Sequence, residues 1–290
     1  MKGLTKIVAR VSCTPWLRSC YRRIQRVPGL RAVSRAVMCR TLPFGTKVWA
    51  RVHAGPAKGL WLKVDPRKEK PFLEGYHELA IQKALQQYLR DGDVFYDVGS
   101  HIGLLSLVAA RMIGAKGEVQ AFEAAPENIA AIEQHVQRNR FPQIRVNPVA
   151  VWSSTGRVSF HRPFLGSLRG VVVPAGDSTP NALDCDVEAT TLDYFVNSHR
   201  PPHVIKVDVE GAEPEVLRGA DKVFNRYRPI LICEVHNQEA RTIVQEWLST
   251  RGYAVEWMGE RDTLPRHLVA RPSSSDDRVL VQVNGSVGSA

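Results

Sequence analysis

The stretch that most constrains the fold is residues 94–103, which read VFYDVGSHIG. Apolar residues lead into an acid, and two glycines follow closely. Gly99 lets the backbone turn sharply, and Gly103 lets a helix start lie close to the strand or to a ligand, because neither carries a Cβ. Residues 104–110 then have the apolarity of a helix that packs on a sheet. The pattern predicts a buried strand, a glycine loop and a helix whose first N–H groups face whatever lies above the strand.

The next strand pattern, residues 118–123, ends in a second acid, Glu123, twenty positions after Gly103. In dinucleotide-binding folds an acid at a similar separation accepts hydrogen bonds from ribose hydroxyls. A helix follows, since Pro126 suits a first turn and apolar residues recur at helical spacing behind it. This βαβα pattern predicts a nucleoside-binding site. The alternative is that the two acids only cap loops.

The residues of the glycine loop also indicate which class of cofactor the site would bind. A pyrophosphate is bound by G-x-G-x-x-G, but the position two after Gly99 is His101, and the pattern here is Asp97-x-Gly99-x-x-x-Gly103. Asp97 at the strand end would repel a pyrophosphate and would suit an ammonium group. S-adenosylmethionine has that ammonium, a ribose for Glu123 and no phosphate. The residues therefore favour a methyl donor over NAD or FAD.

Three stretches resemble the FkbM-type S-adenosylmethionine-dependent methyltransferases: residues 97–103 (DVGSHIG), 122–126 (FEAAP) and 205–213 (IKVDVEGAE). The third is the most specific, and residues 228–234 fit the family's next strand. The family usually has Ala-Asn where this chain has Ser100-His101, which keeps the glycines but changes the side chains that face the cofactor. The resemblance spans residues 75–272. It implies S-adenosyl-L-methionine as cofactor, bound by Asp97, Gly99, Ser100, His101, Gly103 and Glu123.

Strands alternate with helices along most of the chain. This alternation predicts a mainly parallel twisted sheet with helices on both faces and ligands at the carboxyl ends of the strands. With the resemblance, it indicates a Rossmann-like class I methyltransferase fold of the α/β class. The expected parts are a basic extension (1–45), a methyltransferase domain (46–272) and a flexible tail (273–290). Within that domain we expect a β-hairpin and helix lead-in (46–92), a core (93–272) and a β-rich insertion (152–192).

The remaining elements follow from hydrophobic period and from Gly and Pro positions. Pro148 implies an end or an irregularity in the third core strand. The expected strands are 47–52, 60–64, 144–151, 157–161, 171–173, 187–191, 203–209, 230–235, 253–258 and 267–269. The expected helices are 78–90, 214–223 and 239–250.

An acidic cluster follows two consecutive strand patterns. The candidate catalytic residues are Asp208, Glu210, Glu234 and His236. The two strands alternate with one helix, so they are expected to be neighbours and to bring these side chains into one site. The cluster would deprotonate an acceptor hydroxyl, or hold a hard cation. A proton-accepting cluster without a metal is favoured, because the spacing of these acids and the histidine along the chain matches no dedicated metal-binding motif. Glu213 and Glu215 are interpreted as stabilising a helix N-terminus.

The positive charge of the chain is concentrated at its N-terminus. The net charge is +10, yet no Asp or Glu precedes Asp65. Of the 39 Lys and Arg residues, 14 lie before Asp65, which leaves 25 against 29 acidic residues and a net charge of −4 in the remainder. This segment would suit an amphipathic helix on anionic lipid or an organelle transit peptide. The pattern favours a loosely ordered lead-in with solvated arginines.

The number of cysteines and the length of the apolar runs limit the cellular compartment and the class of protein that the sequence can represent. The five cysteines are odd in number and form no C-x-x-C pair, which indicates neither a disulfide framework nor a zinc cluster. Cys233 is expected to be a small buried hydrophobe. No apolar run approaches the roughly 18 residues that a membrane-spanning helix needs. We expect a cytoplasmic protein, with peripheral membrane association as the alternative, and no base-reading nucleic-acid motif.

The sequence thus predicts an S-adenosylmethionine-dependent methyltransferase. Its acceptor is expected to be a hydroxyl of a sugar, a glycan or a secondary metabolite, an expectation that rests mainly on the resemblance and on the available bases. Two alternatives stay open at this point. One is a nicotinamide-dependent oxidoreductase on the same architecture, and the other is a nucleoside-binding protein without catalysis.

Overall fold

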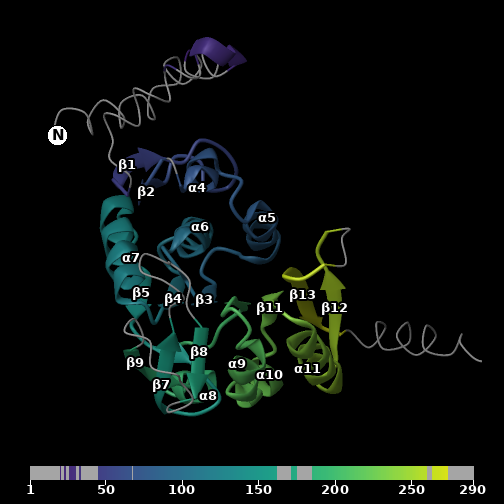
Figure 1. The fold of residues 1–290 in the computed structure, drawn as a ribbon. Helices are drawn as coiled ribbons and strands as arrows, with labels where there is room; N and C mark the ends of the chain where they lie inside the picture. The colour runs from purple at the N-terminus through teal and green to yellow at the C-terminus, as the bar shows by residue number, and fades with distance from the viewer. Residues whose placement is uncertain are drawn as a thin grey trace, which may run out of the picture. The chain divides into compact units, whose positions relative to one another are not determined.

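The computed structural model describes residues 45–66, 68–161, 171–174, 185–259 and 263–273, with a few residues between 20 and 33 (Figure 1). The predictions for the basic extension and for the tail therefore fall almost wholly outside the described residues. The chain divides into two compact units, residues 1–86 with 134–140 and residues 87–133 with 141–290. In the described part of the chain, no helix has the length and apolarity needed to cross a bilayer.

The first unit holds the predicted hairpin and most of the predicted lead-in helix. Its elements are β1 (Val48–Arg51), β2 (Trp61–Val64), α4 (Lys70–Glu74) and α5 (Leu79–Tyr88), the last of which ends in the second unit. β1 and β2 pair antiparallel, as predicted. Helix α4 was not predicted, because five residues are too few to show a helical period. It ends at Gly75, whose φ of 81° is left-handed.

The second unit contains a seven-stranded sheet in the order β12-β13-β11-β10-β3-β4-β5 (Figure 1). Its strands are β3 (Val94–Val98), β4 (Glu118–Phe122), β5 (Ile144–Asn147), β10 (Val204–Val207), β11 (Ile230–Val235), β12 (Tyr253–Trp257) and β13 (Arg266–Pro272). Only β13 runs against its neighbours, so the predicted mainly parallel sheet is confirmed. The chain builds outward from β3 through β4 to β5 and then returns to β10 on the other side of β3. Ligands bind at such a switch point, beyond the carboxyl ends of the strands.

The helices of the second unit lie between these strands in sequence. They are α6 (Leu104–Ile113), α7 (Pro126–Asn139, whose end belongs to the first unit), α8 (Leu192–Phe195), α9 (Glu213–Arg218), α10 (Asp221–Tyr227) and α11 (Gln238–Thr250). The single helix predicted over residues 214–223 is wrong, because the chain breaks at Gly219. A Cβ at Gly219 would lie 2.1 Å from the carbonyl oxygen of Trp152, so the chain packs too closely there for any other residue.

Successive side chains of each strand face opposite sides of the sheet. Val94, Tyr96 and Val98 of β3 join a large core with side chains of α9, α10 and α11. Asp97 alternates with them and therefore points to the other face, where α6 contacts β3, β4 and β5. Cys233 of β11 is fully buried in the core, as predicted, and burial raises the pKa of its thiol.

The predicted β-rich insertion forms a separate four-stranded sheet in the order β6-β9-β7-β8. Its strands are β6 (Ala150–Val151), β7 (Gly156–His161), β8 (Val171–Pro174) and β9 (Cys185–Thr190). The strand expected over residues 144–151 is divided at Pro148, where an end or an irregularity was expected. The chain leaves β5 at Asn147 and enters β6 at Ala150, on either side of Pro148, which has no N–H for a sheet ladder.

Candidate active site

The glycine loop joins β3 to α6 and takes the left-handed conformation at both glycines. Gly99 has a φ of 76° and Gly103 a φ of 80°. A Cβ on Gly99 would lie 1.9 Å from the backbone oxygen of Asp208, which follows β10. A Cβ on Gly103 would lie 3.2 Å from the side chain of Ile132 in α7. Gly99 is therefore required by close packing against backbone as well as by φ. At Gly103 the left-handed φ is the main requirement, and Ile132 leaves little room for a Cβ.

Buried polar groups beneath the loop hold it in place. Asp97 has no exposed surface, and its Oδ2 accepts a hydrogen bond of 2.5 Å from the hydroxyl of Ser106. Burial raises the pKa of Asp97, against the pull of the Lys206 ammonium 3.7 Å away. Lys206 Nζ donates to the carbonyl of Gly99 at 2.7 Å, and the Ser100 hydroxyl donates to the carbonyl of Asp97 at 2.7 Å. Asp97, Ser100 and Lys206 thus fix the shape of the loop from below.

Glu123 lies directly after β4 and ties that strand end to the glycine loop. Its Oε2 accepts from the backbone N–H of His101 at 2.7 Å, and its Oε1 accepts from those of Ala124 and Ala125 at 3.0 and 2.8 Å. His101 is itself left-handed, with a φ of 53°. Glu123 is only 8% exposed. Burial raises the pKa of its carboxyl to about 7, although these hydrogen bonds favour the ionised form.

The end of β4 and the glycine loop bring a carboxylate and backbone N–H groups together. Glu123 places a carboxylate at the strand end, where hydroxyl groups can donate to it. Helix α6 begins after Gly103, which has no side chain to cap the first N–H groups of the helix. The predicted cofactor-binding residues therefore gather at the ends of β3 and β4.

The raised pKa of Glu123 predicts a pH-dependent contribution to stability. The folded-state pKa is about 7 against an ordinary value of 4.5, so the folded chain binds the proton more tightly. Below pH 4.5 the carboxyl is protonated in both states, and its contribution is lost as the pH rises through 7. The free energy of unfolding should fall by roughly 3 kcal/mol at most from this group. Denaturant unfolding of the wild type and of Glu123→Gln, from pH 4 to pH 8, measures it.

The Glu123→Gln variant cannot ionise at this position, so its unfolding free energy should not show this fall. The matched control is Glu127→Gln, at an exposed position in the first turn of α7, which should keep the wild-type profile. Parallel pH profiles for the wild type and Glu123→Gln would show that Glu123 titrates normally in the folded chain.

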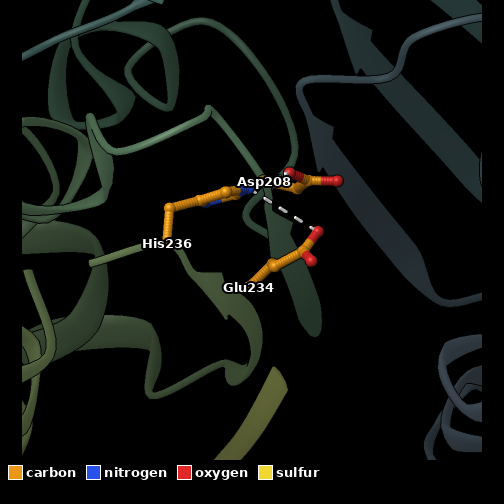
Figure 2. Close-up of side chains that lie close together, drawn as sticks. All are labelled: Asp208, Glu234 and His236. Carbon is orange, nitrogen blue, oxygen red and sulfur yellow. Dashed lines mark ion pairs between the residues drawn. The ribbon is translucent and has the colours of Figure 1, made fainter. Parts of the chain in front are cut away.

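The predicted catalytic residues do meet, because β10 and β11 are parallel neighbours. The ring of His236 extends toward the carboxylates of Asp208 and Glu234 (Figure 2). His236 Nε2 lies 3.7 Å from Asp208 Oδ1, 3.3 Å from Glu210 Oε2 and 3.9 Å from Glu234 Oε2. With Glu213, described next, these residues are called the carboxylate–histidine cluster.

Glu213 belongs to this cluster, which the sequence interpretation missed. It is the first residue of α9, as expected of an acid at a helix N-terminus, but it is fully buried. Its Oε1 lies 2.8 Å from His236 Nδ1 and also accepts from the N–H of Gly211 at 2.9 Å. A carboxylate only accepts, so Nδ1 of His236 carries the proton and the ring is held in one orientation. Glu215 stays outside the cluster and pairs with Arg218.

The electrostatics of the cluster keep Asp208 ionised. Burial alone would raise the pKa of Asp208, but Lys206, 3.4 Å away, and His236 hold it below its ordinary value. Burial opposes charge on His236 as well, yet the carboxylates of Glu213, Asp208 and Glu234 raise its pKa. Asp208 is therefore a carboxylate at neutral pH.

Glu210 differs from the other acids in backbone and in exposure. Its φ of 53° is left-handed, which costs free energy for a residue with a side chain. Its side chain is 27% exposed, against 16% for Asp208 and Glu234 and none for Glu213. Glu210 is thus the most accessible carboxylate of the cluster.

Two further residues at this edge were missed by the sequence interpretation. Lys206 of β10 is 5% exposed and pairs across the sheet with Asp97. His267 of β13 lies opposite Glu234, with 3.5 Å between Nε2 and Oε2. A lysine inside an apolar strand was a readable signal for the first. Nothing in the sequence around His267 indicated that β13 would pair antiparallel with β11 and place this histidine opposite Glu234.

Comparisons with known proteins agree with this arrangement. The profile of the FkbM methyltransferase domain matches residues 97–255. The hexuronic acid methyltransferase AglP of Haloferax volcanii is 28% identical over 162 residues, which are 55% of this chain and 62% of that protein. This chain therefore spans less than two thirds of that curated relative.

Solved methyltransferase structures align with part of this chain at low sequence identity. Methyltransferase FkbM from Methylobacillus flagellatus KT aligns over 69% of this chain and 46% of its own, at 17% identity and a TM-score of 0.47. Fibrillarin of Aeropyrum pernix, solved with bound S-adenosyl-L-methionine, aligns over 66% and 72%, at 14% identity and a TM-score of 0.42.

Proposed function

The chain belongs to the FkbM family of S-adenosylmethionine-dependent methyltransferases, and we propose that it methylates a hydroxyl group of a sugar or glycan. The observation that supports this is the carboxylate–histidine cluster, which directly adjoins the glycine loop. The backbone of Asp208 contacts Gly99, so the groups that handle a proton lie beside the loop assigned to the donor. We assign the donor to Asp97, Gly99, Ser100, His101, Gly103 and Glu123.

Methyl transfer needs a positioned oxygen and a group that takes its proton. When bound, S-adenosylmethionine supplies a methyl group that leaves its sulfonium sulfur as a new C–O bond forms, and the C–S electrons stay on sulfur. We assign the proton of the acceptor hydroxyl to Glu210 Oε2. Glu210 is the most accessible carboxylate of the cluster, and a hydroxyl can approach it from solvent. Asp208, Glu234 and His236 position the acceptor, and Glu213 fixes the His236 ring.

The charge of the cluster favours a neutral hydroxyl over an acceptor carboxylate. Its four carboxylates face one buried lysine and two histidines, His236 and His267, so a further anion placed among them would be repelled. A hexuronic acid, the acceptor class in the name of the Haloferax relative, offers both hydroxyl and carboxyl oxygens. We propose that the chain uses the hydroxyl, which makes a methyl ether.

The product distinguishes these two oxygens. The full-length chain is incubated with S-adenosylmethionine and, in parallel, with a hexuronoside and the matching neutral hexoside. A methyl ether survives mild alkali, whereas a methyl ester is hydrolysed. An alkali-stable product supports the proposal. An alkali-labile product would mean carboxyl methylation, and no transfer to any sugar would contradict the acceptor class.

The basic extension is proposed to be accessory to this chemistry. Every residue assigned to the donor and to the acceptor lies between residues 97 and 236, within the second unit. Deleting residues 1–40 should therefore leave the affinity for S-adenosylmethionine within about twofold, well under the tenfold that 1.4 kcal/mol represents, as measured by calorimetry. A loss of affinity would show that the extension belongs to the catalytic domain.

Vesicle binding decides between the two interpretations of the extension. If it rests on anionic lipid, the full-length chain should sediment with anionic vesicles, the truncated chain should not, and salt should weaken the binding. Equal binding of the full-length and the truncated chains supports a solvated lead-in. We propose a cytoplasmic enzyme, in keeping with the free cysteines Cys20, Cys185 and Cys233 among the described residues.

A further inference from the structure

Three side chains at the ends of β10 and β11 offer the ligand atoms of a metal site. One atom each from Asp208, Glu234 and His236 lies within 4.8 Å of the other two (Figure 2). His236 Nε2 is 3.7 Å from Asp208 Oδ1 and 3.9 Å from Glu234 Oε2. Around an octahedral ion with bonds of about 2.1 Å, neighbouring ligand atoms lie roughly 3 Å apart. The separations from Nε2 are roughly 0.7 to 0.9 Å wider than that spacing, so the side chains would need to converge around the ion.

The histidine of this trio is oriented as metal-binding histidines are. Its Nδ1–H donates to Glu213, a carboxylate with no exposed surface. A carboxylate on one ring nitrogen fixes the tautomer and the ring plane, and it makes the other nitrogen a better ligand. In the neutral ring Nε2 is therefore the nitrogen that carries the lone pair, and it faces Asp208, Glu210 and Glu234.

A buried polar atom without a hydrogen bond marks the centre of the cluster. Within the described residues, His236 Nε2 is buried and has no hydrogen-bond partner, and neither has Oε2 of the fully buried Glu213. A lone pair surrounded by carboxylates is repelled by all of them. Four carboxylates meet here, and Lys206 is the cation 3.4 Å from Asp208. A positive ion between Nε2 and the carboxylates would satisfy the nitrogen and offset the excess negative charge.

We propose that Asp208, Glu234 and His236 bind one divalent cation, with Glu213 as the residue that positions His236. One nitrogen and two carboxylate ligands suit Mn²⁺ better than Mg²⁺ or Ca²⁺, which prefer oxygen alone. This differs from the metal-free cluster favoured by sequence spacing. The second part of the inference rests on the proposed function: the cation polarises the acceptor hydroxyl and makes its proton easier for Glu210 to take.

Calorimetric titration of the full-length chain with MnCl₂ tests the site without any methyl transfer. The protein is first treated with chelator and desalted, and neither donor nor acceptor is present. We expect one Mn²⁺ per chain. Asp208→Asn and Glu234→Gln should each weaken binding at least tenfold, and Glu213→Gln should weaken it by about 10–100-fold. The matched control is Glu256→Gln, an exposed acid in β12, which should leave Mn²⁺ affinity within twofold.

Further measurements distinguish the loss of a metal ligand from poor folding of a variant. Thermal unfolding and titration with S-adenosylmethionine show whether each variant keeps its fold and its cofactor site. In the wild type, pulsed electron paramagnetic resonance of bound Mn²⁺ should show coupling to an imidazole nitrogen, and His236→Gln should remove it. Absence of that coupling in the wild type would overturn the assignment of His236.

The metal site and the proposed function fail in different ways. No Mn²⁺ binding to the wild type, or binding that Asp208→Asn and Glu234→Gln leave unchanged, overturns the metal site. Binding of both Mn²⁺ and S-adenosylmethionine without transfer to any sugar hydroxyl keeps the site and overturns the proposed acceptor. Metal-dependent transfer to a sugar hydroxyl supports both.

Discussion

Replacing Glu210 with Gln should lower kcat by about 10²–10⁴-fold, the range that a lost general base commonly costs. The substitution keeps the shape and length of the side chain and removes only its capacity to take a proton. The affinity for S-adenosylmethionine should stay within about twofold, because the hydrogen bonds that hold the glycine loop from below come from Lys206 and Ser100. Single-turnover rates with a saturating sugar acceptor, alongside calorimetry with the donor, measure both quantities.

The matched control for this variant is Glu215→Gln. Glu215 lies in the first turn of α9, close to Glu210 in sequence, but it pairs with Arg218 outside the cluster. Its replacement should leave kcat unchanged. If Glu210→Gln turns over as fast as the wild type while Asp208→Asn or Glu234→Gln is slow, the proton goes to another carboxylate of the cluster.

A methyl group added at Gly99 should abolish cofactor binding and destabilise the fold. In Gly99→Ala the new Cβ would lie 1.9 Å from the backbone oxygen of Asp208, a contact that only a shift of the backbone can relieve. The left-handed φ adds roughly 1–2 kcal/mol for any residue with a Cβ. The clash comes on top of that, so we expect a loss of about 4 kcal/mol or more, at the extreme of single substitutions. Denaturant unfolding and calorimetry with S-adenosylmethionine measure the two effects.

Gly92 provides the control for this prediction. It lies in the same unit, and its φ of 85° is also left-handed, but a Cβ there would meet nothing within 4 Å. Gly92→Ala should therefore cost only the roughly 1–2 kcal/mol of the left-handed conformation and leave cofactor affinity intact. Equal losses in both variants would mean that φ alone, and not contact with Asp208, determines the need for Gly99.

Local patterns were sufficient to predict most of the parallel sheet. The apolar run before Asp97 and the glycines after it identify β3 and the start of α6, because both depend on neighbours in sequence. The break between α9 and α10 was not predictable in this way. It comes from close packing of Gly219 against Trp152, which is distant in sequence. Pro148 did indicate the end of β5, since a residue without an N–H interrupts any ladder.

The candidate site was predictable only where it follows strand ends. Asp208 and His236 could be paired because consecutive parallel strands are usually neighbours. Glu213 was interpreted as a helix-terminal acid, and it is one, but its bond to His236 depends on how α9 packs. Lys206 was readable in retrospect, because a lysine within an apolar strand must find an anionic partner. His267 depends on the register of β13, which no local pattern specifies.

The ammonium of Lys206 links the two halves of the site thermodynamically. It donates to the carbonyl of Gly99 in the donor loop and pairs with Asp208 on the acceptor side. A ligand that changes the position or charge of one neighbour changes the free energy of the other through this shared cation. Linkage then requires reciprocity: whatever factor the donor applies to acceptor affinity, the acceptor applies to donor affinity. The strength of the coupling between donor binding and acceptor binding would therefore depend on one buried lysine that contacts both sides of the site.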